Sequence, residues 1–295
     1  MRMRFLTFLL LCLSFAASGA IEVVDDRGAT LSLEQPARRV ISLAPHLTEL
    51  MFAAGAGGRL VGVVRDSDFP PQARAIARIG DAAGADFERM IALQPDLVLA
   101  WGSGNRASVV ERLRQLGFAV LVLEPRVLED IPRHIGMLGM LAGTSAAAGD
   151  AVRAFSQRSA RLRARYEHAR PVNVMFEMWH RPIMTVSGEH MISDVLRMCG
   201  SRNVFADLPQ LAAEISLEQV LIRDPEVIVV GSEAAGAGIA DWKDYPYLKA
   251  VGNGRVYNVS ADLITRQTPR ILDAAEQICS DLERVRTHLT PSLSP

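Results

Sequence analysis

Residues 86–100 read D-F-E-R-M-I-A-L-Q-P-D-L-V-L-A, and residues 216–230 read S-L-E-Q-V-L-I-R-D-P-E-V-I-V-V. In each stretch a helix-capping residue comes first and a glutamate, Glu88 or Glu218, follows two positions later. A helical segment, a proline next to an acidic residue and a run of β-formers complete both copies. The glutamates lie 130 positions apart, and each precedes its proline by seven positions. The chain therefore contains the same helix-to-strand corner twice, which predicts two similar lobes.

Around these corners the predicted strands and helices alternate. Thr48 is expected to cap a helix, Gly55 and Gly200 are expected to end helices with positive φ, and prolines keep residues 66–71 irregular. The expected strands cover 40–43, 60–64, 97–100, 119–123 and 172–176, and the expected helices cover 49–54, 107–116 and 191–198. Such alternation is typical of parallel sheets, so the predicted fold class is α/β, with two doubly wound lobes.

A long helix is expected between the two copies of the corner. Residues 145–169 are rich in Ala, Arg and Ser and contain no proline, which predicts about 25 helical residues, roughly 37 Å in length. An ordinary crossover helix is the alternative to a strut that connects the lobes. The predicted organisation is an N-terminal lobe over 38–143, a connecting helix over 144–170 and a C-terminal lobe over 171–290.

Residues 1–20 have the pattern of an export signal, with a basic start at Arg2 and Arg4, an apolar core and a small-residue cleavage site near Ala20. An N-terminal membrane anchor and a lipoprotein processed at Cys12 are the alternatives. We expect a soluble mature protein in the periplasm. Loss of the two arginines changes the formal net charge from −1 to −3, and so weak a charge provides no basic field for nucleic acid.

After this processing two cysteines remain, Cys199 and Cys279. In an oxidising compartment an isolated pair is typical of a disulfide, and two unpaired buried thiols are the alternative. A bond would close a loop of about 80 residues and constrain the unfolded chain by roughly 4–5 kcal/mol. Cys279 lies in a final helix expected over 269–286, whose register allows contact with the helix that precedes Cys199.

Glu88 and Glu218 each occupy the second position of a predicted helix, where a carboxylate stabilises the helix by about 0.3–1 kcal/mol through the dipole. This local role explains either glutamate alone. Two glutamates at equivalent places in a duplicated corner also present matched acidic groups to the outside. We therefore predict that each receives an arginine from a partner protein, which would provide steering and register.

Candidate ligand-binding residues follow the predicted strands, because doubly wound sheets bind ligands at the carboxyl ends of their strands. Trp101 follows one strand and precedes a glycine-rich loop, and Trp179 follows a strand in the second half. An indole there can form a flat apolar wall. Arg266 lies in a similar loop and could bind ligand carbonyls or carboxylates. Core tryptophans and a surface arginine are the alternatives.

His46, His180 and His190 are candidate metal or haem ligands. No pair of them has i, i+4 or Cys/His-cluster spacing, so we expect loop or surface histidines and no metal site. The chain contains no G-x-S-x-G, P-loop, H-E-x-x-H or G-x-G-x-x-G motif. We expect a protein that is not an enzyme and has no cofactor of its own; a secreted hydrolase is the distant alternative.

Taken together, these residues show that the chain resembles the periplasmic substrate-binding proteins of ABC importers for metal chelates, namely siderophores, haem and cobalamin. The similarity runs from about Arg39 to Arg286. The motifs that carry it are R-V-I-S-L-A-P-H-L-T-E-L (39–50), L-V-G-V-V-R-D-S-D-F-P-P-Q-A (60–73), F-E-R-M-I-A-L-Q-P-D-L-V-L-A-W (87–101), C-G-S-R-N-V-F (199–205), S-L-E-Q-V-L (216–221) and T-P-R-I-L-D-A-A-E-Q-I-C (268–279).

The resemblance implies two lobes joined by one long helix, a ligand held in the cleft between them, and only small closure. It implies that Glu88 and Glu218 dock onto arginines of an inner-membrane ABC permease, which works with ATPase subunits. It also implies that Cys199 and Cys279 form the disulfide of the family. The binding protein itself is expected to be a monomer.

Within the family the motifs match the cobalamin binders best, which implies a corrinoid as the transported ligand; haem or a ferric siderophore is the alternative. Three pocket aromatics of those binders map to Asp66 and near Ala82 and Ala213, so this chain has a smaller stacking surface. Phe69 or Trp179 is expected to compensate. The ligand contacts implied by matching positions are Asp66, Trp101, Asp262, Leu263, Ile264, Thr265 and Arg266.

Overall fold

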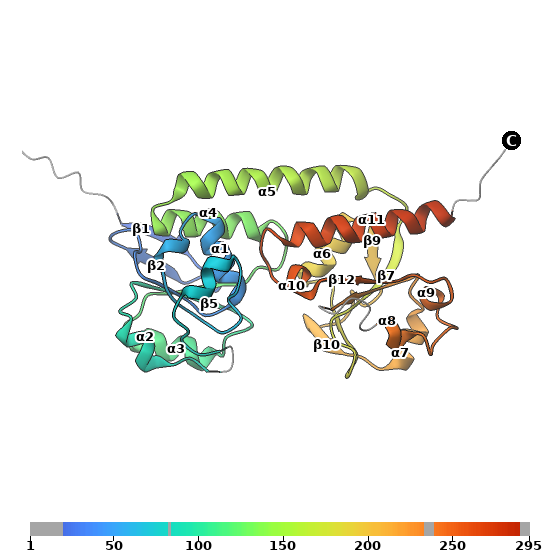
Figure 1. Cartoon of the computed structure of the whole chain (residues 1–295), viewed down its shortest axis with the longest axis horizontal. Coiled ribbons are helices and arrows are strands. Elements are labelled where there is room, and N and C mark those ends of the chain that lie inside the picture. Colours follow the sequence, from blue (N-terminus) through green and yellow to red (C-terminus); the bar gives the residue numbers. More distant parts are fainter. Residues whose placement is uncertain (1–19, 82–83, 233–238, 290–295) are drawn as a thin grey trace, which may run out of the picture.

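The computed structural model describes residues 20–81, 84–232 and 239–289, which form two α/β lobes (Figure 1). The strands of the first sheet are β3 (Val40–Ser42), β4 (Leu60–Val63), β5 (Leu97–Trp101) and β6 (Val120–Leu123). Those of the second are β7 (Val172–Glu177), β9 (Ser201–Asn203), β11 (Val227–Gly231) and β12 (Val256–Val259). All pairs in both sheets are parallel. The predicted two-lobe α/β fold is therefore confirmed.

The two sheets have the same topology. Their strand orders are β4-β3-β5-β6 and β12-β11-β7-β9, so in each lobe the first strand lies between the second and the third, and the fourth is at the edge. Strands such as β6 are apolar along their length, with all residues buried. Parallel strands covered on both faces have this character. Because the topology repeats, equivalent residues of the two lobes can be matched by counting from the duplicated elements.

The helices lie on two sides of each sheet (Figure 1). The first lobe contains α1 (Pro45–Ala53), α2 (Phe87–Ala92), α3 (Ala107–Gln115) and α4 (Asp130–Ala142). The second contains α6 (Met191–Met198), α7 (Leu217–Arg223), α8 (Ile239–Trp242), α9 (Lys249–Gly252), α10 (Ala261–Ile264) and α11 (Ile271–Leu289). The long helix α5 (Ser145–Tyr166) runs along one side of the molecule, next to α4 and α11, while α2 and α7 lie on the opposite side (Figure 1).

The side of the molecule near α5 has one continuous apolar core. A single cluster of buried residues includes residues from the first strands of both sheets and Phe155, Leu162 and Tyr166 of α5. On the other side each lobe has a separate cluster, beneath α2 and α3 in the first lobe and beneath α7 in the second. The lobes are therefore joined along one edge by close packing, which opposes large relative movement.

The two ends of α5 pack against equivalent glycines. Gly55 and Gly200 follow α1 and α6 with φ of +72° and +66°, as predicted for helix ends. A Cβ at Gly55 would lie 2.6 Å from Ala147 Cβ, and a Cβ at Gly200 would lie 2.3 Å from the Tyr166 carbonyl oxygen. Both glycines therefore serve the turn and the close approach of α5.

The duplicated corners form as predicted. Asp86 caps α2, where its carboxylate accepts a hydrogen bond from the Arg89 amide (3.0 Å). Ser216 caps α7, where its hydroxyl accepts one from the Gln219 amide (3.3 Å) and the Gln219 side chain completes a capping box. Glu88 and Glu218 occupy the second position of their helices and are exposed.

The predicted disulfide between Cys199 and Cys279 is present. It links the end of α6 to α11, and both cysteines are buried. The two elements are separated by 80 positions in the sequence, so the bond closes much of the second lobe.

Some local expectations were wrong. Thr48 does not cap α1; the helix begins at Pro45, a residue whose fixed φ suits the first helical position. Within α1 the Thr48 hydroxyl bonds to Ser42 Oγ (3.0 Å) and Ser67 Oγ (3.2 Å), which fixes the irregular segment at 66–71. Two antiparallel pairs add to the predicted elements: β1 (Ile21–Val24) with β2 (Thr30–Leu33), and β8 (Met184–Val186) with β10 (Ala212–Glu214).

Several expectations fall on residues outside the described ranges. These are the export signal up to residue 19, including Cys12, and the position near Ala82. Among the described residues, no helix has both the length and the apolar character needed to cross a membrane.

Candidate functional site

A cavity of about 270 Å³ lies at the seam between the two lobes. The lining residues of the first lobe lie at the end of β5 or just after β5 and β6. Those of the second lobe lie just after β7, at the start of α6, on or next to β10, and before α11. The lining residues are Trp101, Ser103, Glu124, Pro125, Arg126, Met178, Glu189, His190, Met191, Leu211, Ala212 and Gln267. The cavity therefore borders the carboxyl ends of parallel strands in both lobes, where doubly wound folds bind ligands.

Trp101 is the last residue of β5, and its surroundings hold the indole in place. Its amide donates a hydrogen bond to Asn105 Oδ1 (2.7 Å), and Asn105 Nδ2 donates to the Leu43 carbonyl (3.1 Å). The His46 ring meets the indole edge-on, with centroids 5.0 Å apart. A Cβ at Gly104 would lie 1.8 Å from the indole, so the loop can cover Trp101 only because this residue is glycine. A fixed aromatic wall results.

His46 is buried in α1, so the expectation of a loop or surface residue was wrong. Burial lowers the pKa of His46 to about 3, and the positive charges of His134 and Arg266 act in the same direction. The imidazole is therefore neutral at neutral pH. It packs against Trp101 and does not line the cavity.

The polar lining of the cavity is weakly acidic. Glu124 and Glu189 contribute carboxylates, and Arg126 contributes a guanidinium. His190 caps α6, where its Nδ1 accepts a hydrogen bond from the Ile192 amide (3.1 Å), and burial lowers its pKa to about 4. Most of the other walls are apolar. The cavity therefore suits a guest with a large uncharged surface and a few polar groups.

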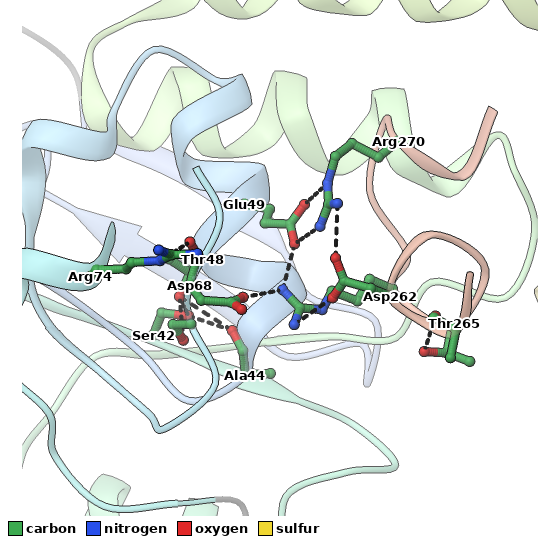
Figure 2. Close-up of polar contacts among 12 residues, drawn as sticks. Ser42, Ala44, Thr48, Glu49, Asp68, Arg74, Asp262, Thr265 and Arg270 are labelled. Atoms are coloured by element: carbon green, nitrogen blue, oxygen red, sulfur yellow. Dashed lines mark hydrogen bonds and ion pairs between the residues drawn. The ribbon is translucent and has the colours of Figure 1, made fainter. Parts of the chain in front are cut away.

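An inter-lobe ion network joins Glu49 and Asp68 of the first lobe to Asp262, Arg266 and Arg270 of the second (Figure 2). Arg270 donates to Glu49 from Nε (2.9 Å) and Nη2 (2.7 Å) and to Asp262 from Nη1 (2.9 Å). Arg266 Nη1 donates to Glu49 (2.9 Å) and Asp68 (2.8 Å), and its Nη2 lies 2.6 Å from Asp262. The Glu49 side chain is only 3% exposed, so its contacts with the two arginines are shielded from water, whereas the Asp68 side chain is 49% exposed.

The charges of this network stabilise one another. Burial by itself would lower the pKa of Arg266 and Arg270, but hydrogen bonds to the carboxylates raise both. Burial would raise the pKa of Asp68, but the hydrogen bond and the charge of Arg266 lower it. Arg266, Arg270 and Asp68 are therefore charged at neutral pH. Arg266, a predicted ligand contact, already bonds to three carboxylates.

A second inter-lobe contact is made by an acid of the second lobe, Asp194, which contacts the first lobe. Asp194 lies six positions before Gly200, as Glu49 lies six positions before Gly55. Its carboxylate accepts a hydrogen bond from the Leu128 amide of the first lobe (2.9 Å) and lies 3.4 Å from Arg163 of α5. Glu49 on α1 thus contacts the segment before α11, and Asp194 on α6 contacts the segment before α4.

The other predicted ligand contacts lie outside the cavity lining. Asp66 is exposed, with φ of +65°. Phe69 lies under the Arg270 guanidinium, 3.9 Å from its ring centroid, and so belongs with the ion network. The Trp179 ring is 64% exposed, and its Nε1 donates to the Arg181 carbonyl (3.0 Å). Ala213 lies on β10 next to Ala212, which does line the cavity.

The segment from Asp262 to Arg266 is not the predicted loop, because it includes most of α10. Leu263 packs against the large apolar core and Ile264 is buried. The Thr265 hydroxyl donates to the Ala261 carbonyl (2.8 Å), within the helix (Figure 2). Apart from its two charged residues, this segment therefore has a structural role in the present arrangement of the lobes.

The remaining histidine, His180, also lies away from the cavity lining. Its Nδ1 is 3.3 Å from the carboxylate of Glu177, which is buried at the end of β7 and accepts a hydrogen bond from Trp242 Nε1 (2.6 Å). Burial raises the pKa of Glu177. In the described part of the chain, no group of three or more His, Cys, Asp or Glu residues has the arrangement of a metal site.

Four polar residues of the cavity were not predicted from the sequence, namely Glu124, Arg126, Glu189 and Gln267. Glu124 and Arg126 follow a predicted strand, so the rule that selected Trp101 would have found them too. The inter-lobe contacts of Glu49, Arg270 and Asp194 were not predicted either. For Glu49 and Asp194 a signal was present, because each lies six positions before a helix-ending glycine, Gly55 or Gly200.

Comparison with known proteins places this chain among proteins of the same architecture. A family model described as periplasmic binding protein matches residues 40–263. The vitamin B12-binding protein of Vibrio cholerae serotype O1 is 37% identical over 249 residues, which are 84% of this chain and 90% of that protein. The vitamin B12-binding protein of Vibrio parahaemolyticus is 37% identical over 254 residues, 85% of this chain and 92% of that one.

A solved structure has the same fold over nearly its whole length. The crystal structure of the periplasmic vitamin B12 binding protein BtuF of Vibrio cholerae superposes with a TM-score of 0.80 at 36% identity. The match covers 85% of this chain and 98% of that one.

Proposed function

The chain belongs to the periplasmic binding protein family, and on that premise we propose that it captures cobalamin between its lobes and delivers it to the permease of an ABC importer. The observation that carries the proposal is the seam cavity, walled by Trp101 and apolar side chains, in a chain that covers most of the vitamin B12-binding relatives. Binding and release without covalent chemistry are all that the proposal requires.

The chemistry of the cavity supports a corrinoid. A corrinoid is a large chelate whose peripheral amides are uncharged, and it needs apolar walls with a few hydrogen-bonding groups. A guest with several carboxylates would instead meet Glu124 and Glu189, with Arg126 as the one guanidinium among the lining residues. The lining therefore favours a guest with little negative charge.

The size of the cavity adds a mechanical requirement. Its volume of about 270 Å³ is below the range of about 300–1,000 Å³ that is typical of sites for drug-sized ligands. A corrinoid would fit only in part while the lobes are placed as they are. Loading therefore requires the seam to widen, which strains or breaks contacts of the inter-lobe ion network. The shared core along α5 limits how far the lobes can part.

Titration of the purified protein with cyanocobalamin, followed by calorimetry and thermal melting, tests the proposal. We expect saturable binding and a higher melting temperature. The absence of both heat and a melting shift at millimolar ligand would reject it. Binding of haemin with a shifted Soret band, in a protein that ignores cyanocobalamin, would replace the corrinoid with a haem.

Delivery is proposed to use Glu88 and Glu218. Both are exposed, and α2 and α7 lie on the same side of the molecule, opposite α5 (Figure 1). The Ser216 hydroxyl, by hydrogen bonding, lowers the pKa of Glu218. Arginines on a permease would complement both charges. Charge reversal of the two glutamates together should abolish uptake and leave cyanocobalamin affinity unchanged; normal uptake by this double variant would contradict the docking role.

Residues 1–20 are proposed to direct export and to be removed near Ala20, which would place a monomeric mature protein in the periplasm. The mass and N-terminal sequence of protein recovered from the periplasm test this. Protein found only in the cytoplasm, with its first residues retained, would contradict it.

A further inference from the structure

Beside each docking glutamate the structure exposes a large apolar side chain. Ile222 of α7 is 83% exposed, the highest value among the exposed large hydrophobic residues of the described chain, and Ile91 of α2 is 50% exposed. Ile91 lies three positions after Glu88, and Ile222 lies four positions after Glu218. Residues at these spacings are neighbours on one helix face. Each duplicated corner therefore presents a carboxylate and an isoleucine side by side.

Packing within the lobes does not account for these isoleucines. Met90 and Val220, the central apolar residues of the two short helices, are fully buried, and Leu221 packs against the core under α7. Ile91 and Ile222 belong to none of the buried clusters of the described chain and pack against none of them. A single exposed apolar residue is ordinary in soluble proteins. Here each of the two lies one helical turn after the glutamate of its corner, although the 130-position repeat aligns Ile91 with Leu221 and Ile222 with Ala92.

We propose that Ile91 and Ile222 are the apolar anchors of the two docking surfaces, each inserting into a hydrophobic depression beside an arginine of the permease. This proposal rests on the proposed function, in which the glutamates dock by charge, and it adds an apolar contact beside each glutamate. Charge complementarity selects this occupant, because within the described residues no ion pair joins Glu88 or Glu218 to a basic side chain. Both carboxylates can therefore pair with a cationic partner, and the isoleucines add an apolar patch next to each cation.

The two components of each surface have separable effects on association. Exposed charges mainly speed the encounter, and salt screens their effect. Apolar side chains buried at an interface mainly slow dissociation and depend little on salt. The glutamates should therefore control docking at low ionic strength, and the isoleucines should contribute equally at all ionic strengths.

Uptake of radiolabelled cyanocobalamin by spheroplasts of the host, deleted for its own copy of this protein, provides the test. Purified protein is added over a range of concentrations, and the concentration for half-maximal uptake is measured at low and high salt. The Ile91→Ala/Ile222→Ala variant should need about tenfold more protein at both salt levels. The Glu88→Gln/Glu218→Gln variant should need more protein mainly at low salt. Both variants should bind cyanocobalamin and melt like the unaltered protein.

A Val24→Ala/Met140→Ala variant is the matched control. It shortens two exposed apolar side chains on β1 and α4, which lie away from α2 and α7 (Figure 1). Its half-maximal concentration should equal that of the unaltered protein. If the half-maximal concentration is unchanged for the isoleucine variant but increased for the glutamate variant, the isoleucines are not anchors, and docking by charge alone remains. Failure of the unaltered protein to support any uptake would instead remove the proposed function, and this inference with it.

Discussion

The two lobes share one topology and one exposed corner, yet they differ at equivalent positions along the seam. Counting from Glu88 and Glu218, Trp101 at the end of β5 corresponds to Gly231 at the end of β11. Counting back from Gly55 and Gly200, Ala54 corresponds to Cys199, and His46 corresponds to Met191. Both corners have kept the exposed glutamate, while residues around the cavity and along the lobe cores have diverged.

The conserved glutamates and the diverged cavity residues correspond to two different requirements on the lobes. A partner that contacts both lobes in the same way requires two like surfaces, and the corners on α2 and α7 provide them. A ligand between the lobes meets two different walls, so the residues there need not match. The lobes also have different supports: a disulfide ties α6 to α11, whereas α1 and α4 pack without one.

The largest expected effect concerns the disulfide. Cys199→Ala/Cys279→Ala should lose roughly 4–5 kcal/mol of unfolding free energy, because closing a loop with 80 positions between its ends constrains the unfolded chain. Urea unfolding measures the loss, and the reduced unaltered protein should match the variant. A loss below about 1 kcal/mol would mean that the second lobe, like the first, is stable through packing alone.

The next effect compares the two buried acids. Glu49→Ala should cost roughly 3–5 kcal/mol, because it removes the buried carboxylate that two largely buried guanidinium groups share. Asp194→Ala should cost less, roughly 1–3 kcal/mol, because it mainly leaves the Leu128 amide without an acceptor. Urea unfolding of both variants, with Glu49→Gln to separate charge from shape, gives the ranking. A larger cost for Asp194→Ala would reverse this assignment.

A third effect depends on pH and concerns His46 and Met191. The pKa of His46 falls from 6.5 to about 3 on folding, so below about pH 6.5 the unfolded state binds a proton that the folded state does not. The unfolding free energy should therefore decrease by about 1.4 kcal/mol per pH unit as the pH falls from about 6 toward 4. His46→Met, which copies the residue of the other lobe, should make that decline less steep. An equal slope in the variant would show that other groups cause it.

The smallest effect compares Trp101 with Trp179. Trp101→Ala should weaken cyanocobalamin binding by about 1 kcal/mol, or roughly fivefold, through loss of an aromatic wall, and Trp101→Phe should retain most of it. Trp179→Ala should change affinity less, because that ring lies outside the cavity lining. Calorimetric titration measures all three variants. A larger loss for Trp179→Ala would place the ligand on the exposed ring.

The parts of the fold that were predictable depend on short-range physics. Asp86 and Ser216 cap their helices through amides three positions away, and Gly55 and Gly200 take the positive φ that favours glycine. Trp101 could be placed at the cavity because the carboxyl end of a parallel strand is a general location for ligands. Each of these conclusions needs only neighbouring residues or a rule of topology.

The errors have a common physical reason. Residues 262–266 were expected to form a loop, but 262–264 belong to α10, and Arg266 bonds to Glu49, which lies 217 positions earlier in the sequence. His46 was expected at the surface, yet the helix that starts at Pro45 packs it against Trp101. No local pattern encodes which distant side chain meets which.

By itself, the sequence determined that this protein has two like α/β lobes, a helix between them, a cysteine pair and two matching acidic corners, because periodicity, caps and repeats are local properties. Only the tertiary structure decided that buried acids from each lobe bind the other and that the guest cavity is small in this arrangement. Those features depend on burial and on contacts between residues 66 to 221 positions apart. A charge is desolvated, and needs a partner, only once the chain has folded.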